Sequence, residues 1–410
     1  MIDSKTISTN LKTLTLMGKI LDYIQEQGSG KYTLYHTKKM SLDENLPETL
    51  DYDDKPATQI AKSPFAETNQ KRVKTVRISD SYIKATAPIF SYFLDGSRHI
   101  YKIDDIAIGR KIYPVLAGQI IVGCCQRPSR DEFKKLIVEN KIVIAMPDDF
   151  DLDDENKGGN FCRLYCEKIN KEMEKVPFLK EHDIKLSQML LYKTDGHDEL
   201  LKGKDKYRSR AQAVIQNEMT DSEQLVVKEL CKRHLLDDEH FLIKDGSIDY
   251  NPRYSNMGLS ATEFALLHAN YKHVVGVSKR FDPELMNDFE GNRLSKTISN
   301  LKPYERTKVY EYQSEYSGSY YAVWYLRIRN SEYRETPISD IVKCEMVLDD
   351  KGAMINTEVI DIISANLIRE AYPVCYGNDA RWANHLYPVY LTESFCKSQY
   401  ISNEVIYKIF

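Results

Sequence analysis

Two apolar segments of the chain end in the same polar tripeptide. FLDGS places Asp95 after one segment, and LIKDGS places Asp245 after the other. Asp-Gly is a common hairpin signal, so either aspartate taken alone indicates only a turn. Two aspartates at strand ends can instead bring carboxylate oxygens together from separate strands, and Mg²⁺ or Mn²⁺ prefers oxygen ligands. The pair therefore predicts a metal-dependent site that activates water for attack on a phosphodiester.

A third carboxylate is expected from the helix that precedes Asp245. The segment TDSEQLVVKELCKRH has an N-cap residue at its start, acidic residues in its first turn and apolar residues at helical spacing. We expect Glu223, one turn into this helix, to face the sheet, with Glu218 and Glu229 as alternatives. The other interpretation is that Glu223 is a solvated residue favoured by the helix dipole.

A lysine ends the next predicted strand. HFLIKDGSI and YKHVVGVSKRF each have the composition of a strand, and Lys279 lies at the end of the second. Its ammonium can contact the scissile phosphate or orient the attacking water, although lysines at strand ends are usually only solvated. Lys279 is therefore a predicted catalytic residue.

The elements that must position these residues form a mixed α/β pattern. From Ala87 onward the sequence predicts three short strands with tight connections, and Asp95-Gly96 is expected to form the hairpin turn between the first two. Strands, an inserted region, then strands and helices are typical of an α/β domain. The expected divisions are an N-terminal arm over residues 1–75 with a helix at 11–24, and a nuclease domain over 76–410 with a mainly helical insertion at about 128–207.

The order of these motifs resembles the NurA nucleases, the partners of HerA-type hexameric DNA translocases. DGS at a strand end, a helix carrying Glu, LIKDGS and then VVGVSK follow one another from about Phe90 onward. The resemblance implies an RNase H-like sheet flanked by helices, a homodimer, and DNA cleavage with two Mn²⁺ or Mg²⁺ ions. By the same resemblance Asp95, Glu223 and Asp245 match the metal ligands, and Lys279 matches the lysine of the GVSK strand. It also implies a HerA-like hexameric ATPase as partner, in DNA repair or antiviral defence.

The chain departs from this family near its C-terminus. Many members carry a histidine after a YP-containing motif, whereas YPVYLTESFCKS has Phe395 and Lys397 in that region. His385 precedes the motif instead. We expect either His385 or Lys397 to supply the final catalytic group.

Two other functions remain open from the sequence. One is a catalytically inactive NurA-like scaffold that only docks on an ATPase ring. The other is an Argonaute-like nuclease, which would share the carboxylate chemistry but would need a guide-end pocket that the sequence does not indicate. The GxxxxGK[ST] spacing is absent, so ATP hydrolysis is expected from another subunit.

Composition narrows the class of protein. A formal charge of −4, with 42% hydrophobic and 29% charged residues, is typical of a folded globular chain and not of a globally basic nucleic-acid binder. The sequence has no apolar stretch of bilayer length and no secretory signal at its start, so we expect no membrane association and a cytoplasmic location. One local basic cluster, expected to be solvated surface, comprises Arg293, Lys296, Lys302, Arg306 and Lys308.

Overall fold

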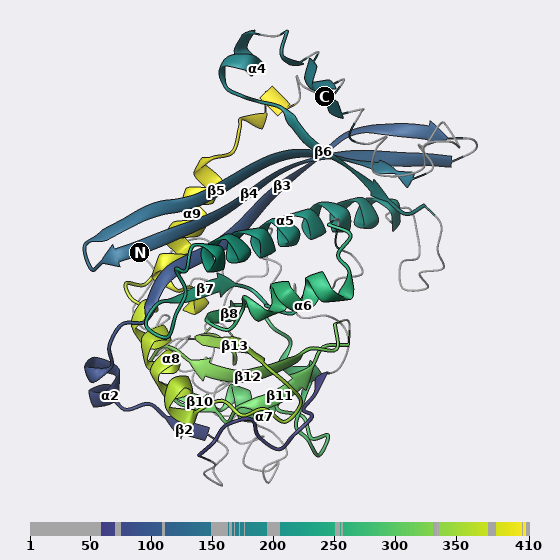
Figure 1. The fold of residues 1–410 in the computed structure, drawn as a ribbon. Helices are drawn as coiled ribbons and strands as arrows, with labels where there is room; N and C mark the ends of the chain where they lie inside the picture. The colour runs from purple at the N-terminus through teal and green to yellow at the C-terminus, as the bar shows by residue number, and fades with distance from the viewer. Residues whose placement is uncertain are drawn as a thin grey trace, which may run out of the picture.

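A computed structural model gives the fold of the chain, and Figure 1 shows its elements. The predicted helix at 11–24 and most of the expected N-terminal arm lie outside the described residues. Those residues are 59–69, 75–108, 111–148, 163, 166–167, 169–171, 173–175, 177–194, 206–250, 255, 257–315, 317–330, 334, 336–375, 383–403 and 405–406.

Within this part of the chain, eleven strands form one mixed sheet and two short strands form a separate parallel pair, β1 with β9. The path through the sheet is β2-β10-β12-β13-β8-β7-β3-β4-β5-β6, and β11 pairs with β12. The strands are β1 (Gln59–Ile60), β2 (Thr75–Arg77), β3 (Phe90–Ile108), β4 (Lys111–Ser129), β5 (Glu132–Pro147), β6 (Leu186–Tyr192), β7 (Phe241–Asp245), β8 (Val274–Ser278), β9 (Met286–Asn287), β10 (Glu305–Thr307), β11 (Tyr310–Gln313), β12 (Tyr320–Arg327) and β13 (Ile341–Leu348).

Helices flank this sheet on both faces (Figure 1). One apolar core joins the sheet to α5, and a second joins its other face to α8 and α9. None of the described helices is long and apolar enough to cross a membrane. The helices are α2 (Asp80–Ala85), α4 (Pro177–Glu181), α5 (Lys206–Lys232), α6 (Ala261–Ala269), the 3-10 helix η4 (Pro283–Leu285), α7 (Ser295–Ser299), α8 (Thr357–Glu370) and α9 (Tyr387–Ser398).

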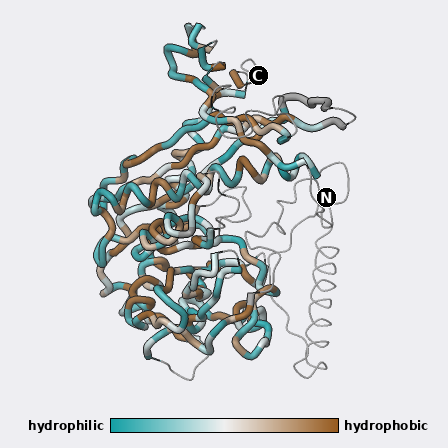
Figure 2. Tube along the Cα trace, turned by 45° about the vertical axis from the view of Figure 1, so that its right-hand side comes forward, coloured by the Kyte–Doolittle hydropathy of each residue, from teal (hydrophilic) through white to brown (hydrophobic). Residues whose placement is uncertain are grey.

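The centre of the sheet has the mixed arrangement that the sequence predicts. Strands β3, β4 and β5 pair antiparallel, whereas β7 pairs parallel with both β3 and β8. Figure 2 shows polar and apolar residues alternating along the long helix α5, as expected for a helix with one face on a sheet. The prediction of a large mixed α/β sheet flanked by helices is confirmed.

The strands that lead into this centre differ from the prediction in length. β3 and β4 are each 19 residues long and pair along almost their whole length. The Asp95-Gly96 step lies inside β3, opposite Gly123 and Val122 of β4, so the predicted hairpin turn at this step is wrong. The reason is that β4 continues to supply hydrogen-bond partners beyond Asp95, so the backbone has no need to reverse there.

Two further predictions about elements need correction. The region expected as a mainly helical insertion contributes β5 and β6 to the main sheet, because β5 pairs antiparallel with the long strand β4 and β6 then pairs parallel with β5. Helix α5 begins at Lys206 and not near Thr220, and the Thr220 hydroxyl donates to Gln216 O inside the helix. The preceding residues of α5 are good helix formers, so Thr220 has no first turn to cap.

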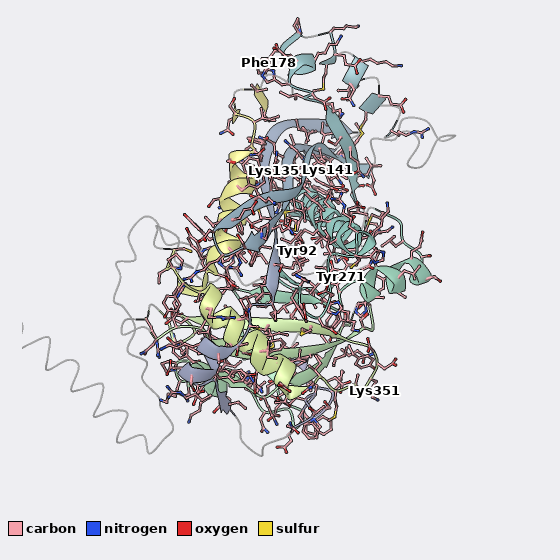
Figure 3. All side chains as sticks on the ribbon, turned by 60° about the vertical axis from the view of Figure 1, so that its left-hand side comes forward. Tyr92, Lys135, Lys141, Phe178, Tyr271 and Lys351 are labelled. Carbon is pink, nitrogen blue, oxygen red and sulfur yellow. The ribbon has the colours of Figure 1, made fainter. Side chains whose placement is uncertain are left out.

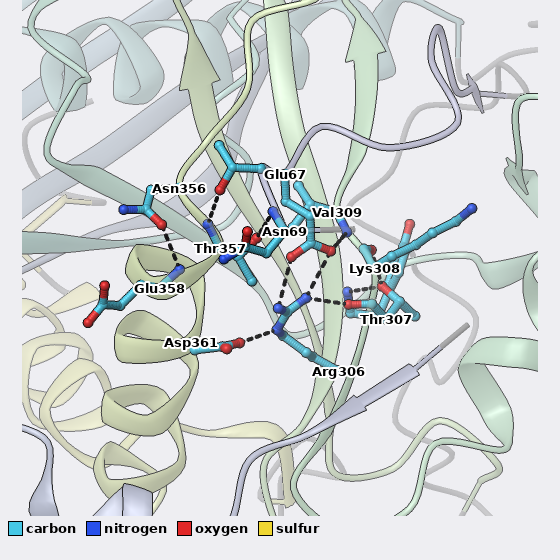
Figure 4. A network of polar contacts seen from close by, with 12 residues as sticks. Glu67, Asn69, Arg306, Thr307, Lys308, Val309, Asn356, Thr357, Glu358 and Asp361 are labelled. Atoms are coloured by element: carbon cyan, nitrogen blue, oxygen red, sulfur yellow. Dashed lines mark hydrogen bonds and ion pairs between the residues drawn. The ribbon is translucent and has the colours of Figure 1, made fainter. Parts of the chain in front are cut away.

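The N-terminal part of the described chain is fastened to the sheet by a buried ion-pair network (Figure 4). Arg306 on β10 donates through Nη2 to Glu67 Oε2 at 2.9 Å and through Nε to Asp361 Oδ1 at 2.7 Å. Glu67 Oε1 also accepts from Val309 N at 3.1 Å. Arg306 is fully buried, so its expected role as a solvated basic residue is wrong; two carboxylates compensate its charge.

Candidate active site

Three neighbouring strands place Asp95, Asp245 and Lys279 on the same face of the sheet. β3 pairs with β7 up to Leu94, and Asp245, the last residue of β7, pairs with Val277 of β8. Because side chains alternate along a strand, Asp95 shares a face with Phe93. Phe93 packs in the apolar core between the sheet and helices α8 and α9. The same alternation places Asp245 and Lys279 on that face. The structure therefore brings together three of the predicted site residues.

Lys279 is the centre of an ion-pair group on this face. Its Nζ lies 2.7 Å from Asp245 Oδ2 and 3.6 Å from Glu393 Oε2 of α9. The side chain is only 4% exposed, and burial acts to lower its pKa, but Asp245, Glu393 and Asp95 together raise it. Lys279 is therefore a buried cation at neutral pH, not the solvated lysine of the alternative interpretation.

Glu393 is a site residue that the sequence analysis missed. It also accepts from Lys397 Nζ at 2.7 Å, one helical turn further along α9. Burial acts to raise the pKa of Glu393, but Lys279 and Lys397 outweigh it and lower the pKa to about 2. The i,i+4 spacing of Glu393 and Lys397 within YPVYLTESFCKS was the available signal, since such residues share one helix face.

The C-terminal candidates occupy different positions around Glu393. His385 is buried just before α9, with Nδ1 4.0 Å from Glu393 Oε2, and its ring lies edge-on to Tyr390. Lys397 is largely exposed and pairs with Glu393 from the outside. His385 therefore lies closer to the interior of the group than Lys397 does.

Asp95 is the carboxyl group of this site whose ionisation is least favourable. Its side chain is buried, and Oδ2 makes no hydrogen bond within the described residues. Burial raises the pKa of Asp95 well above its ordinary value; Asp245, Glu393 and Glu223 raise it further, and Lys279 only partly opposes them. A buried carboxylate with an unpaired oxygen and carboxylate neighbours is an environment that favours an added cation.

Glu223 lies next to this group but on the α5 side of the sheet. Its carboxylate contacts the backbone of Gly96, where a Cβ atom would clash with Oε1. Lys244 Nζ lies 2.8 Å from Glu223 Oε2, and both side chains are buried. Burial raises the pKa of Glu223 more than Lys244 lowers it, while Glu223 helps to raise the pKa of Lys244. Lys244 is a second residue that the sequence analysis missed.

The two alternatives to Glu223 have other partners. Glu218 is buried and pairs with Lys141 of β5 at 2.8 Å. Glu229 is more exposed and pairs with Arg233 at 2.8 Å. Of the three candidate glutamates, Glu223 is the one that affects the pKa of Asp95. It lies in the middle of α5 and not in its first turn.

The donor chemistry of the group fits a hard divalent cation in part. Asp95 and Asp245 offer carboxylate oxygens, and Asp95 Oδ2 is unpaired. Within the described residues, however, no three His, Cys, Asp or Glu side chains are arranged to hold a metal ion. Lys279 and Lys244 neutralise Asp245 and Glu223 instead. Asp95 and Asp245 are therefore the residues best suited to bind such a cation.

Comparison with known proteins gives a distant structural likeness. No protein-family model and no curated protein matches the chain. The fold is similar to a solved crystal structure of the NurA nuclease from Sulfolobus solfataricus, with a TM-score of 0.38 and 9% sequence identity. The match covers 100% of this chain and 95% of that one.

Proposed function

We propose that this chain is a metal-dependent nuclease that hydrolyses phosphodiester bonds in DNA. The observation that carries the proposal is the buried Asp95 beside Asp245, with Lys279 and Glu393 completing a charged group drawn from β3, β7, β8 and α9. Perturbed ionisable residues that converge from separate elements are typical of catalytic sites. We propose Mn²⁺ or Mg²⁺ as the cofactor, held by Asp95 and Asp245, whereas Glu223 lies on the α5 side of the sheet and pairs with Lys244. When bound, the cation would lower the pKa of a water molecule and neutralise phosphate charge.

The other side chains have distinct roles in this proposal. Lys279 stays protonated and offers an ammonium to a non-bridging phosphate oxygen. Glu393 is ionised at neutral pH, and its Oε2 atom lies 4.0 Å from His385 Nδ1, within electrostatic range but beyond hydrogen-bond distance. A histidine beside a carboxylate can transfer a proton at the attacking water or at the leaving oxygen. Each of these roles belongs to a side chain on the α9 face of the sheet.

The direct test is cleavage of linear and plasmid DNA in Mn²⁺ by the wild type and three variants. Asp95→Asn and Asp245→Asn should each lower the rate at least about a hundredfold, because each removes one carboxylate charge from the proposed ligand set. Asp350→Asn, at an exposed turn after β13, is the matched control and should cleave normally. Wild-type rates in both site variants would overturn the nuclease proposal.

For assembly we propose a homodimer that works with a HerA-like hexameric ATPase in DNA end processing for repair or defence. The support is the sequence resemblance together with the absence of a GxxxxGK[ST] motif from the chain. Mass photometry of the chain alone and with such an ATPase tests this directly. A chain that remains monomeric and unbound, with duplex digestion unchanged by ATPase and ATP, would exclude the coupled machine.

A second candidate function is a catalytically inactive scaffold for such an ATPase. The observation that favours it is that Lys279 and Lys244 pair with Asp245 and Glu223. In that case these ion pairs are structural, and Mn²⁺ binds no more tightly to the wild type than to Asp95→Asn. Isothermal titration with Mn²⁺ alone separates the two functions, because it does not depend on finding the right DNA substrate.

A further inference from the structure

A second candidate binding site lies at the far end of α9 from His385. A cavity of about 540 Å³ opens between the end of α9, strand β5 and the segment that joins α4 to β6. A volume of this size falls within the range of small-molecule pockets and accommodates a nucleoside. Its lining includes Asn140, Phe178, His182, Lys185, Ser187 and Gln399.

An aromatic pair stands at this cavity. Phe178 is 47% exposed, which is unusual for a phenylalanine, and its ring centroid lies 4.4 Å from that of His182. The Nδ1 atom of His182 lies 2.9 Å from Phe178 O, so Nδ1 carries a proton and fixes the orientation of the imidazole ring. Figure 3 shows Phe178 at the end of the molecule beyond Lys141, far from Lys351. The pair forms an exposed, oriented aromatic surface.

The walls of the cavity are held by hydrogen bonds to the main sheet. Gln119 of β4, which is fully buried, accepts from Ile401 N at 2.8 Å and donates to Ile401 O at 2.9 Å. Ser187 Oγ accepts from Ile142 N at 3.2 Å. The wall formed by the residues after α9 and the wall formed by β5 and β6 are thus fixed in place. The cavity is therefore largely preformed.

The lining carries little net charge. Lys185 Nζ lies 3.3 Å from Asp183 Oδ1, so the two charges in the lining compensate each other. The remaining polar side chains are the amides of Asn140 and Gln399, the hydroxyl of Ser187 and the imidazole of His182, which together offer donors and acceptors. This set suits a neutral, flat heterocycle with mixed donors and acceptors better than it suits a phosphate group.

We infer that this cavity binds an unpaired nucleobase of a single-stranded DNA segment whose backbone continues toward Glu393. The inference rests on the proposed nuclease function. Gln399 lies six residues after Glu393 along α9, which corresponds to about 9 Å at 1.5 Å per residue. An extended single strand of a few nucleotides can bridge that length. The exposed Lys397 lies between the two and can contact the intervening backbone.

The test is fluorescence anisotropy with a labelled single-stranded oligodeoxythymidylate of about 12 nucleotides, in EDTA so that no cleavage occurs. Phe178→Ala should weaken binding about tenfold, equivalent to ~1.4 kcal/mol, because base stacking on an aromatic ring is lost. Phe178→Trp should retain the affinity. Phe289→Ala removes an equally exposed phenylalanine at a distant turn and should have no effect.

Each outcome separates the base pocket from the nuclease proposal. A duplex of the same length should bind equally well to wild type and Phe178→Ala, since its bases are paired and stacked. Unchanged single-strand affinity in Phe178→Ala, equal losses for single strand and duplex, or no binding by the wild type would each overturn the base pocket. None of these results depends on cleavage, and loss of cleavage in Asp95→Asn does not depend on Phe178.

Discussion

The ammonium of Lys279 lies 2.7 Å from the Oδ2 atom of Asp245, and both groups belong to the ends of adjacent parallel strands. Lys279 also faces Glu393 at 3.6 Å, so one buried cation serves two carboxylates from different elements. A third carboxylate, Asp95, lies within their electrostatic range and keeps one oxygen unpaired. The stability of this group depends on Lys279, and its capacity for a further cation depends on Asp95.

Replacing Lys279 by Met should destabilise the fold by about 3 kcal/mol at pH 7, because it leaves buried carboxylates without their counter-charge. The measurement is the free energy of unfolding from urea denaturation, with the exposed Lys351→Met as control. Mn²⁺ should raise the melting temperature of Lys279→Met more than that of the wild type, since the ion replaces the lost charge. Equal stability of the two lysine variants would show that Lys279 is not needed to hold these carboxylates.

Replacing Asp95 by Asn should stabilise the metal-free protein at pH 7. The folded-state pKa of Asp95 is raised, so its ionisation costs folding free energy as pH rises above the ordinary value of 3.8. The gain from Asp95→Asn is therefore absent below about pH 3.8 and grows as pH increases toward the folded pKa. At pH 7 we expect a melting temperature roughly 2–4 °C higher, the change per 1 kcal/mol in a large domain. A melting temperature lower than that of the wild type at pH 7 would contradict the raised pKa.

Replacing Glu393 by Gln should have the opposite pH dependence. Its folded pKa of about 2 lies below the ordinary value of 4.5, so its contribution is complete above pH 4.5 and is lost as pH falls toward 2. We expect a loss of ~3 kcal/mol at neutral pH and almost none near pH 2. Urea denaturation at both pH values measures this, and the exposed Glu239→Gln is the control. A loss independent of pH would mean that packing, and not charge, accounts for the role of Glu393.

Replacing Gly96 by Ala should displace Glu223. The added methyl group would clash with Glu223 Oε1, would press against the Met219 side chain, and so would disturb the ion pair of Glu223 with Lys244. We expect a destabilisation of about 1–3 kcal/mol, because Lys244 is buried and would lose its partner. In the Glu223→Ala background, Gly96→Ala should cost less stability than it costs in the wild type, because the clash with Oε1 is gone. An equal cost in both backgrounds would show that the close contact with Met219, and not Glu223, decides the effect.

The proposed cleavage should depend on the kind of divalent cation. Mn²⁺ and Mg²⁺ should support it, whereas Ca²⁺ should not, because its larger and looser coordination shell holds phosphate and water poorly for in-line attack. EDTA should stop the reaction, and added Mn²⁺ should restore it. Sustained cleavage of linear DNA in EDTA would exclude a metal-dependent mechanism.

Much of the site's position follows from local sequence patterns. The apolar segments that precede Asp95, Asp245 and Lys279 predicted three elements. Parallel pairing of β3 with β7 and of β7 with β8 brings the three residues to one region of the sheet, although β3 continues beyond Asp95. Side-chain alternation was also predictable. Alternation places Asp95, Asp245 and Lys279 on one face of the sheet. It places Lys244, the residue before Asp245, on the other face.

The remaining parts of the site depend on tertiary packing. Glu393 reaches Lys279 only because α9 packs across β3 and β4, and no local pattern specifies that docking. Gly96 was expected to lie in a hairpin turn, whereas it lies inside β3 and a glutamate from α5 occupies the space beside it. The true Asp-Gly turn is at Asp245, where Gly246 has a φ of +80°. The two Asp-Gly pairs differ in their strand neighbours. β4 continues to pair with β3 beyond Gly96, whereas β7 ends at Asp245.

The buried Arg306–Glu67 pair has a consequence for the order in which the chain can fold. The two residues are 239 positions apart, so Glu67 leaves the ribosome long before its partner on β10 exists. Contacts across such a separation form late, because the entropy of closing the long loop must be overcome first. The segment around Glu67 therefore stays undocked, with its carboxylate solvated, until the sheet has assembled as far as β10. A nascent or truncated chain that ends before Glu305 lacks the cation needed to bury this segment, so the N-terminal attachment cannot form until the ribosome has passed β10.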